Sequence, residues 1–293
     1  MGRKVKVGIV ALSVDESILR SHYLDTYEYF LAANINPFGI VVEGLVYTQG
    51  YEIKNSQLYT GVKIVRDDSM FRKGYVISEI RDYFTKRAFE ENEYDYILSC
   101  DDDFKFRPRS HESILNDVLY MERYRNVGVT CMHYHKGGPD DSVLQDIVLP
   151  TYYYDFNPSR VATRSGIMIR KEAFVSWGGE DKVRYFEEAV MATYAYQEGF
   201  RVVHSLSDTI HKTKSTGLGQ SLERKYGKND IPQSGRQILH QKGLLDPSLD
   251  KEGNPRYDTP CKVSSKLLKD HLDNHRRRFN MGEESYLMLV EGV

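Results

Sequence analysis

Three consecutive aspartates, Asp101, Asp102 and Asp103, are the side chains in this sequence best suited to chemistry. Adjacent carboxylates repel one another unless a cation or solvent compensates their charge. Carboxylate oxygens are also the ligands that Mg²⁺ and Mn²⁺ prefer, and such an ion can bridge the phosphates of a nucleotide diphosphate. The run therefore predicts a divalent-metal site or, as the plainer alternative, a solvated acidic turn.

The elements that must position these aspartates alternate between strands and amphipathic helices, as in a mostly parallel α/β sheet. The predicted strands of this first half are 5–12, 38–47, 62–65 and 94–100, and the predicted helices are 16–34 and 73–91. Asp15 is placed to cap the first helix. The strand 94–100 delivers the aspartates at its carboxyl end, which is where open α/β sheets bind ligands.

The second half continues the alternation less regularly. Its predicted strands are 127–133, 166–170 and 201–206, and its predicted helices are 110–125, 186–197 and 264–278. Beyond residue 214, scattered glycines and prolines indicate short helices and loops. We expect one α/β domain over 1–214, with halves 1–108 and 109–214, followed by an extension over 215–293.

The bulk composition is that of an ordinary globular protein, because 40% of the 293 residues are hydrophobic and 28% are charged. No window approaches the roughly 20 apolar residues that cross a bilayer, and the start of the sequence lacks a secretory h-region. We therefore expect a cytoplasmic protein without a membrane partner. Three scattered cysteines indicate buried thiols rather than disulfides.

Charge is distributed unevenly along the chain. Residues 1–211 hold 25 basic and 31 acidic side chains, a net charge of −6, whereas residues 212–278 hold 15 basic and 8 acidic side chains, a net charge of +7. Such a basic segment can meet a polyanion or form a solvated helical surface.

The aspartate run lies in a context that resembles a known family. The stretch from Tyr96 to Asp103, with Pro108 seven residues after Asp101, is similar to the DxD signature of family 2-like GT-A glycosyltransferases. The resemblance implies that Asp101 lies near the nucleoside ribose and joins Asp103 as a metal ligand. Asp102 would be the variable middle position of this nucleotide-sugar site, with a solvated side chain.

Two further segments of the first half resemble the family's nucleotide-sugar site. The first predicted strand ends in Ala11, Leu12 and Ser13, where relatives form part of the nucleoside pocket, although the family's usual Pro-Thr-Tyr-Asn-Glu ending is missing. A helix start with basic side chains is suited to phosphate, or is simply a basic turn facing solvent. Its residues here are Arg72, Lys73, Gly74 and, two helical turns later, Arg81.

An acid pair, Glu187 and Glu188, stands where relatives carry a Glu-Asp pair at the start of a helix. The resemblance implies that Glu188, or Glu187 close behind it, is the general base that takes the proton of the acceptor hydroxyl. Two alternatives stay open. In one, the two acids only complement the helix dipole. In the other, Glu180 and Asp181 supply the base, because they belong to a segment similar to the WGGED element of β-galactosyltransferases.

A histidine downstream of the last predicted strand completes the implied site. His211 stands where many GT-A enzymes place a third metal ligand, and Lys212 and Lys214 beside it would face the phosphates. Imidazole and two carboxylates form a reasonable Mn²⁺ shell. His204 is the alternative ligand.

Together these residues imply a GT-A α/β fold and a metal-dependent glycosyltransferase. Mn²⁺ or Mg²⁺ would be the cofactor and a UDP-sugar the donor, with inversion at the anomeric carbon. The acceptor would be a glycan or, given the basic segment, DNA with a hydroxylated base. The rival interpretations are a metal-dependent phosphohydrolase and a non-catalytic module that binds nucleotide-sugars.

Overall fold

The computed structural model describes residues 4–27, 39–54, 59–70, 77–106, 110–132, 153–155, 157–160, 166–177, 183, 187–205, 210–212 and 234–280. No helix in these ranges combines the length and the apolar character needed to cross a membrane.

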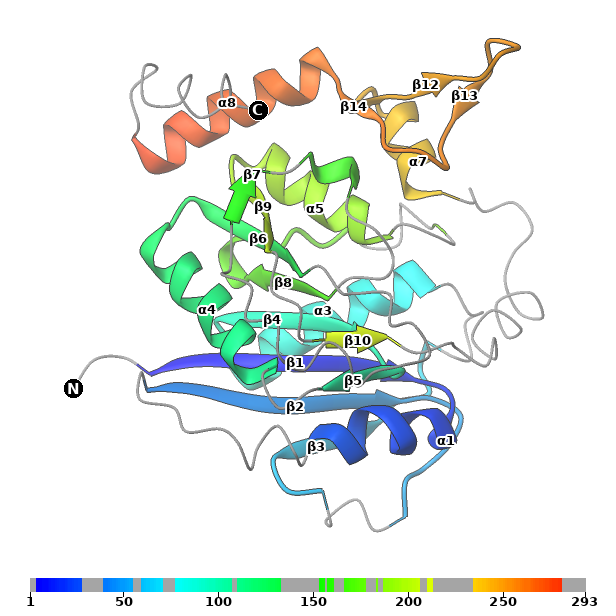
Figure 1. The fold of residues 1–293 in the computed structure, drawn as a ribbon, viewed down its shortest axis with the longest axis vertical. Coiled ribbons are helices and arrows are strands. Elements are labelled where there is room, and N and C mark those ends of the chain that lie inside the picture. The colour runs from blue at the N-terminus through cyan, green and yellow to red at the C-terminus, as the bar shows by residue number, and fades with distance from the viewer. Residues whose placement is uncertain are drawn as a thin grey trace, which may run out of the picture.

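In the described ranges, an eight-stranded mixed sheet forms the centre of the fold (Figure 1). Its strands are β1 (Val5–Ser13), β2 (Ile40–Thr48), β3 (Val62–Arg66), β4 (Tyr96–Asp101), β6 (Val127–Met132), β7 (Tyr153–Asp155), β8 (Ile167–Arg170) and β9 (Arg201–Ser205). They are ordered β3-β2-β1-β4-β8-β6-β9-β7. Strands β3, β2, β1 and β4 are parallel, β8 is antiparallel to both of its neighbours, and β9 runs parallel to β6.

Helices and short strands surround this sheet. The helices are α1 (Glu16–Leu19), α3 (Ile77–Asn92), α4 (Ser110–Arg123), α5 (Glu187–Gln197), α7 (Gly235–Gln241) and α8 (Ser265–Phe279), with a π-helical turn at Arg20–Leu24 and 3₁₀ turns at Pro158–Arg160 and Lys171–Ala173. The short strands are β5 (Phe104–Phe106), β10 (Ile210–Lys212), β11 (Leu245–Asp246), β12 (Ser248–Leu249), β13 (Pro255–Arg256) and β14 (Lys262–Val263).

Both faces of the sheet are buried, which explains the nearly continuous apolar runs of its strands. In β1, Val10 joins one core cluster while Ile9 joins the other, because successive side chains of a strand point to opposite faces. The cluster of Val10 includes residues of α3, α5, α7 and α8. The cluster of Ile9 includes residues of α1 and α4. The C-terminal segment 234–280 thus shares a core with α3 and α5.

Helix α8 packs against the carboxyl end of α5, where backbone carbonyls lack partners within their own helix. His271 Nδ1 donates to Tyr196 O at 2.6 Å, and Asn274 Nδ2 donates to Gln197 O at 2.8 Å. The next two carbonyls, of Glu198 and Gly199, accept from Arg278 Nε at 3.2 Å and His275 Nδ1 at 2.6 Å. Four side chains of α8 therefore bind the last two carbonyls of α5 and those of the two residues that follow it.

The expected elements agree closely with the structure. Most predicted strands and helices are present within one or two residues, and Asp15 caps α1 by accepting from Ser17 N and Ile18 N. The predicted helix 16–34 differs, because a π-helical turn follows α1. The strands β5, β7 and β10 to β14 were not predicted, since segments of two or three residues show no periodicity. All three cysteines are buried and free, as expected.

Candidate active site

The aspartates lie at the carboxyl end of β4, beside the end of β1. Leu12 pairs with Asp101 and Ala11 with Cys100 in the parallel register, so Ser13 extends one residue beyond the last pair. The chain order reverses between β1 and β4, because the strands on either side of this pair connect in opposite directions. Ligands bind at such a switch point in open α/β sheets.

A buried arginine of α3, Arg81, joins the aspartates to the acid pair of α5. Its Nη2 lies 2.7 Å from Asp101 Oδ1, and its Nε lies 3.1 Å from Glu187 Oε1. Glu188 Oε1 is further away, at 3.9 Å from Nη2. The remaining nitrogen, Nη1, donates to Ser99 Oγ at 2.9 Å. The fold therefore brings Asp101, Glu187 and Glu188 into one cluster, although 86 residues separate Asp101 from Glu187 along the chain.

Glu188 is in an environment that favours its protonated form. Burial raises the pKa of this carboxyl well above its usual range, the negative charge of Glu187 adds to the rise, and Arg81 opposes it. Its Oε2 is buried and makes no hydrogen bond to the described residues. A raised pKa makes the deprotonated carboxylate a stronger base, and an oxygen without a hydrogen bond to the described residues is available to take up a proton.

Asp102 is not a solvated bystander, in contrast to the expectation from its middle position. Its Oδ2 accepts a hydrogen bond of 2.6 Å from Ser13 Oγ, which in turn accepts one of 2.6 Å from Tyr51 OH. Burial raises the pKa of Asp102 to about 7, with Asp101 and Asp103 contributing and the Ser13 hydrogen bond opposing. The middle aspartate therefore ties the end of β1 to the aspartate run.

The third aspartate, Asp103, is 2% exposed and directly precedes β5. Strand β5 pairs antiparallel with β10, which places His211 opposite Lys105 and Lys212 opposite Phe104. The backbone pairing thus brings His211 close to Asp103 in space. The structure describes only the backbone of residues 210–212, and among the side chains it does describe, no group of three or more His, Cys, Asp or Glu is arranged around a metal position.

The alternative ligand His204 lies elsewhere in the sheet. It belongs to β9, where it pairs with Cys131 of β6 and Tyr154 of β7, and it is 7% exposed. Two strands, β8 and β6, separate β9 from β4. At a strand spacing of about 4.8 Å, β9 is roughly 14 Å from β4, which is too far for His204 to share a metal with Asp101. The His204 alternative is therefore wrong.

Some predicted site residues lie outside the described part of the chain. These are Arg72, Lys73, Gly74, Lys214 and the competing acid pair Glu180 and Asp181. Two residues that contact the predicted site residues were not predicted: Ser99, which contacts Arg81, and Tyr51, which contacts Ser13. Ser99 is a lone hydroxyl inside an apolar strand, and Tyr51 follows β2 at the same sheet edge, so both carried a weak signal.

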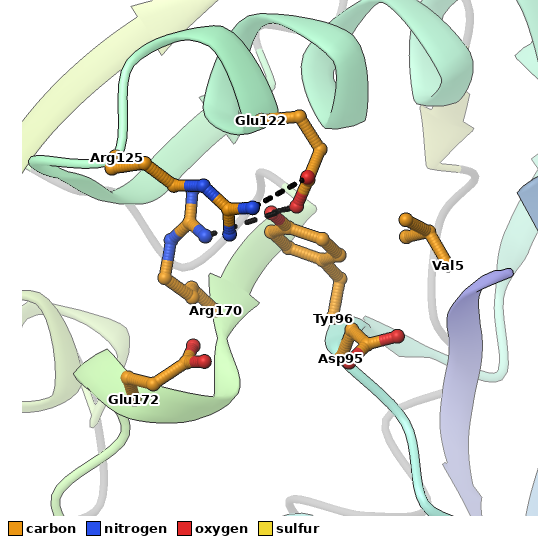
Figure 2. A pocket seen from close by; sticks show the side chains of 7 residues that line it. All are labelled: Val5, Asp95, Tyr96, Glu122, Arg125, Arg170 and Glu172. Atoms are coloured by element: carbon orange, nitrogen blue, oxygen red, sulfur yellow. Dashed lines mark hydrogen bonds and ion pairs between the residues drawn. The ribbon is translucent and has the colours of Figure 1, made fainter. Parts of the chain in front are cut away.

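A polar pocket lies at the amino ends of β1 and β4, opposite to the end that carries the aspartates (Figure 2). Tyr96, the first residue of β4, donates a hydrogen bond to Glu122, and the guanidinium of Arg170 lies 5.1 Å from the Tyr96 ring centroid. Arg170 also donates to the carbonyls of Val127 and Met121. The polar groups of the pocket thus contact one another and hold α4, β4 and β8 together. The carboxyl ends of β1 and β4 remain the better candidate for chemistry.

Comparison with solved structures reveals a known fold. The structure of S. aureus TarS 1–349 in complex with UDP-GlcNAc matches with a TM-score of 0.53 and 14% identity, over 94% of this chain and 73% of that one. A second structure of S. aureus TarS matches with a TM-score of 0.51 and 15% identity, over 94% and 45% of the two chains. No protein-family model and no curated protein sequence matches. The mixed, mostly parallel α/β fold of the GT-A type that the sequence predicted is confirmed.

Proposed function

We propose that this protein is a glycosyltransferase that moves a sugar from a nucleotide-diphosphate sugar, with a UDP-sugar as donor, to an acceptor hydroxyl. The observation that carries the proposal is the Arg81 cluster, which unites Asp101 with Glu187 and Glu188 at the ligand-binding edge of the sheet. A fold shared with a protein whose structure contains UDP-GlcNAc supports the choice of donor.

Glu188 is the proposed general base. Its free Oε2 would take the proton of the acceptor hydroxyl while the acceptor oxygen forms its bond to the anomeric carbon. The bond from that carbon to the diphosphate breaks in the same step, and UDP leaves with the bonding electrons. Attack from the face opposite the leaving group inverts the anomeric configuration.

The donor set near Asp103 fits a divalent cation, because hard carboxylate oxygens of a buried aspartate are what Mn²⁺ or Mg²⁺ prefers. Asp101, Asp103 and His211 would hold the ion, and Lys212 would lie beside the phosphates. When bound, the ion would stabilise the negative charge that develops on the departing diphosphate. The Ser13 hydroxyl and Asp102 would line the nucleoside end of the site.

Calorimetric titration of UDP with and without Mn²⁺ tests the binding part of this proposal. We expect UDP affinity to rise with Mn²⁺ in the wild type and to lose this dependence in Asp103→Asn, because the variant keeps the shape of the side chain but loses its charge. Mn²⁺-independent UDP binding, or none, would contradict the metal site.

A screen of UDP-sugars for release of UDP tests the catalytic part. We expect Glu188→Gln to lower turnover by about 100- to 10,000-fold while UDP affinity persists, because it removes the base and leaves the donor site. UDP binding without turnover of any sugar donor would identify a binding module instead. Release of inorganic phosphate from nucleotides, with no sugar transferred, would indicate a phosphohydrolase.

A further inference from the structure

Arg81 connects three segments of the chain that each carry part of the candidate site. Arg81 is 3% exposed, although it belongs to α3, a helix with several exposed charges. The partners of its guanidinium come from β4 and from the first turn of α5. A buried arginine costs desolvation that only close carboxylates offset, so Arg81 and its partners depend on one another.

The nitrogens of Arg81 are all directed at protein groups. Nε contacts Glu187, Nη1 contacts Ser99 and Nη2 contacts Asp101, each within 3.1 Å. Burial disfavours the charged guanidinium, but the adjacent carboxylates outweigh this effect and raise the pKa of Arg81 above its usual range. A donor phosphate would have to displace carboxylates that already neutralise this charge. Arg81 therefore links β4 to α5 through its hydrogen bonds.

We propose that Arg81 is a positioning residue that holds the Glu187–Glu188 pair against the aspartate run, and that it does not bind the donor phosphates. This inference rests on the proposed function of the same site. Glu187 receives the tight contact at 3.1 Å, whereas Glu188 lies at 3.9 Å and keeps one oxygen free of hydrogen bonds to the described residues. Arg81 thus anchors the first acid and leaves the second available to the acceptor.

The planar fork of arginine suits this task better than lysine. Its nitrogens contact acids on two elements and the Ser99 hydroxyl at the same time, and their directions are fixed by the guanidinium plane. Lysine supplies the same charge from one point on a flexible stem. We therefore expect Arg81→Lys to preserve the fold and the local charge but to hold the acids less accurately.

The test compares Arg81→Lys and Arg81→Gln with Arg87→Gln as the matched control. Arg87 lies on the same helix, where it pairs with Glu91 and Asp67 nearer the surface. The two readouts are calorimetric affinity for UDP with Mn²⁺, and kcat and KM for the UDP-sugar that the wild type hydrolyses fastest. Circular dichroism establishes that each variant is folded.

If Arg81 positions the acids, its substitution should lower kcat and leave UDP affinity unchanged. In Arg81→Gln, kcat should fall by about 100-fold, the loss expected when reacting groups are misplaced by about 1 Å, while UDP affinity and KM stay within about twofold. Arg81→Lys should recover part of kcat, and Arg87→Gln should match the wild type. If Arg81→Gln does not fold, Arg81→Lys provides the test: a lower kcat with unchanged UDP affinity supports the proposal.

Equal losses of UDP affinity and turnover in Arg81→Lys would identify Arg81 as a phosphate ligand and overturn the proposal. Full activity of either Arg81 variant would overturn it as well. A wild type that turns over no UDP-sugar, whether or not it binds UDP, would refute the proposed function itself. The wild-type measurement therefore distinguishes a failure of the positioning role of Arg81 from a failure of the proposed function.

Discussion

At the scale of single residues, the site is governed by the balance of charge around Arg81. Asp101, Glu187 and Glu188 each lie within 3.9 Å of its guanidinium. Burial raises the pKa of Glu188, the negative charges of Glu187 and Asp101 add to the rise, and Arg81 opposes it. Removing a neighbouring charge should therefore change the pH at which Glu188 can act.

The pH dependence of turnover provides the first prediction at this scale. A general base must be deprotonated, so kcat should fall as the pH drops through the raised pKa of Glu188. Glu187→Gln removes a negative charge that raises this pKa, and the acidic limb of the profile should move to lower pH.

The control for this profile is Glu172→Gln, which neutralises an exposed glutamate of the pocket at the amino ends of β1 and β4 and should leave the limb in place. An acidic limb that stays put or moves upward in Glu187→Gln would show that Glu188 does not set the profile.

The residues of the candidate site could be predicted from the sequence in part. The aspartates and the acid pair were recognised as local motifs at the ends of predicted elements, and the structure places Asp101 and both glutamates together. The contacts of Arg81 were not foreseen, because they depend on how α3 and α5 pack across one sheet face. Hydrogen bonds between distant segments, such as Ser13 with Asp102, likewise leave no periodic signal.

At the scale of elements, α5 carries the acid pair at one end and meets α8 at the other. Gly199 follows α5 with φ of +88°, a conformation that favours glycine. A Cβ at this position would lie 2.4 Å from His275 N and 2.6 Å from Asn274 C, both backbone atoms of α8. Position 199 therefore needs glycine for two reasons: the positive φ, and the lack of space for a Cβ beside α8.

Two matched glycine substitutions separate these requirements. Gly253 has φ of +86° but open space around the position of its Cβ. Gly253→Ala should cost about 1 to 2 kcal/mol from the backbone conformation alone. Gly199→Ala should cost about 1 to 3 kcal/mol more, because α8 must also shift.

Thermal and urea unfolding of both variants measure the difference. Equal losses of stability in the two variants would mean that α8 is not packed tightly on α5.

At the scale of the whole molecule, two apolar clusters fill the faces of one sheet, and the C-terminal segment belongs to one of them. Leu239, Leu244, Leu245 and Leu267 of this segment are buried in the same cluster as α3 and α5. Helix α8 also carries exposed bases that make none of the hydrogen bonds to residues 196–199. These bases are Lys266, Lys269, Arg276 and Arg277.

The exposed bases of α8 allow the two proposed acceptor classes to be distinguished. A nucleic-acid acceptor requires duplex binding that weakens steeply with salt. Changing the four bases to glutamine should lower the affinity and flatten the salt dependence by about one unit of slope for each phosphate that is no longer neutralised. Lys86→Gln, an exposed change on α3, is the control. No duplex binding at low salt would exclude this class and leave a glycan.

The capping of α5 by α8 has a consequence for the order of events during synthesis. Domains fold as the chain emerges, N-terminal parts first. The carbonyls of residues 196–199 obtain their α8 partners only after residues 271–278 have emerged from the ribosome. The helix that presents Glu187 and Glu188 is thus completed late, and a nascent chain that already contains every residue of the Arg81 cluster still lacks the support at the far end of α5.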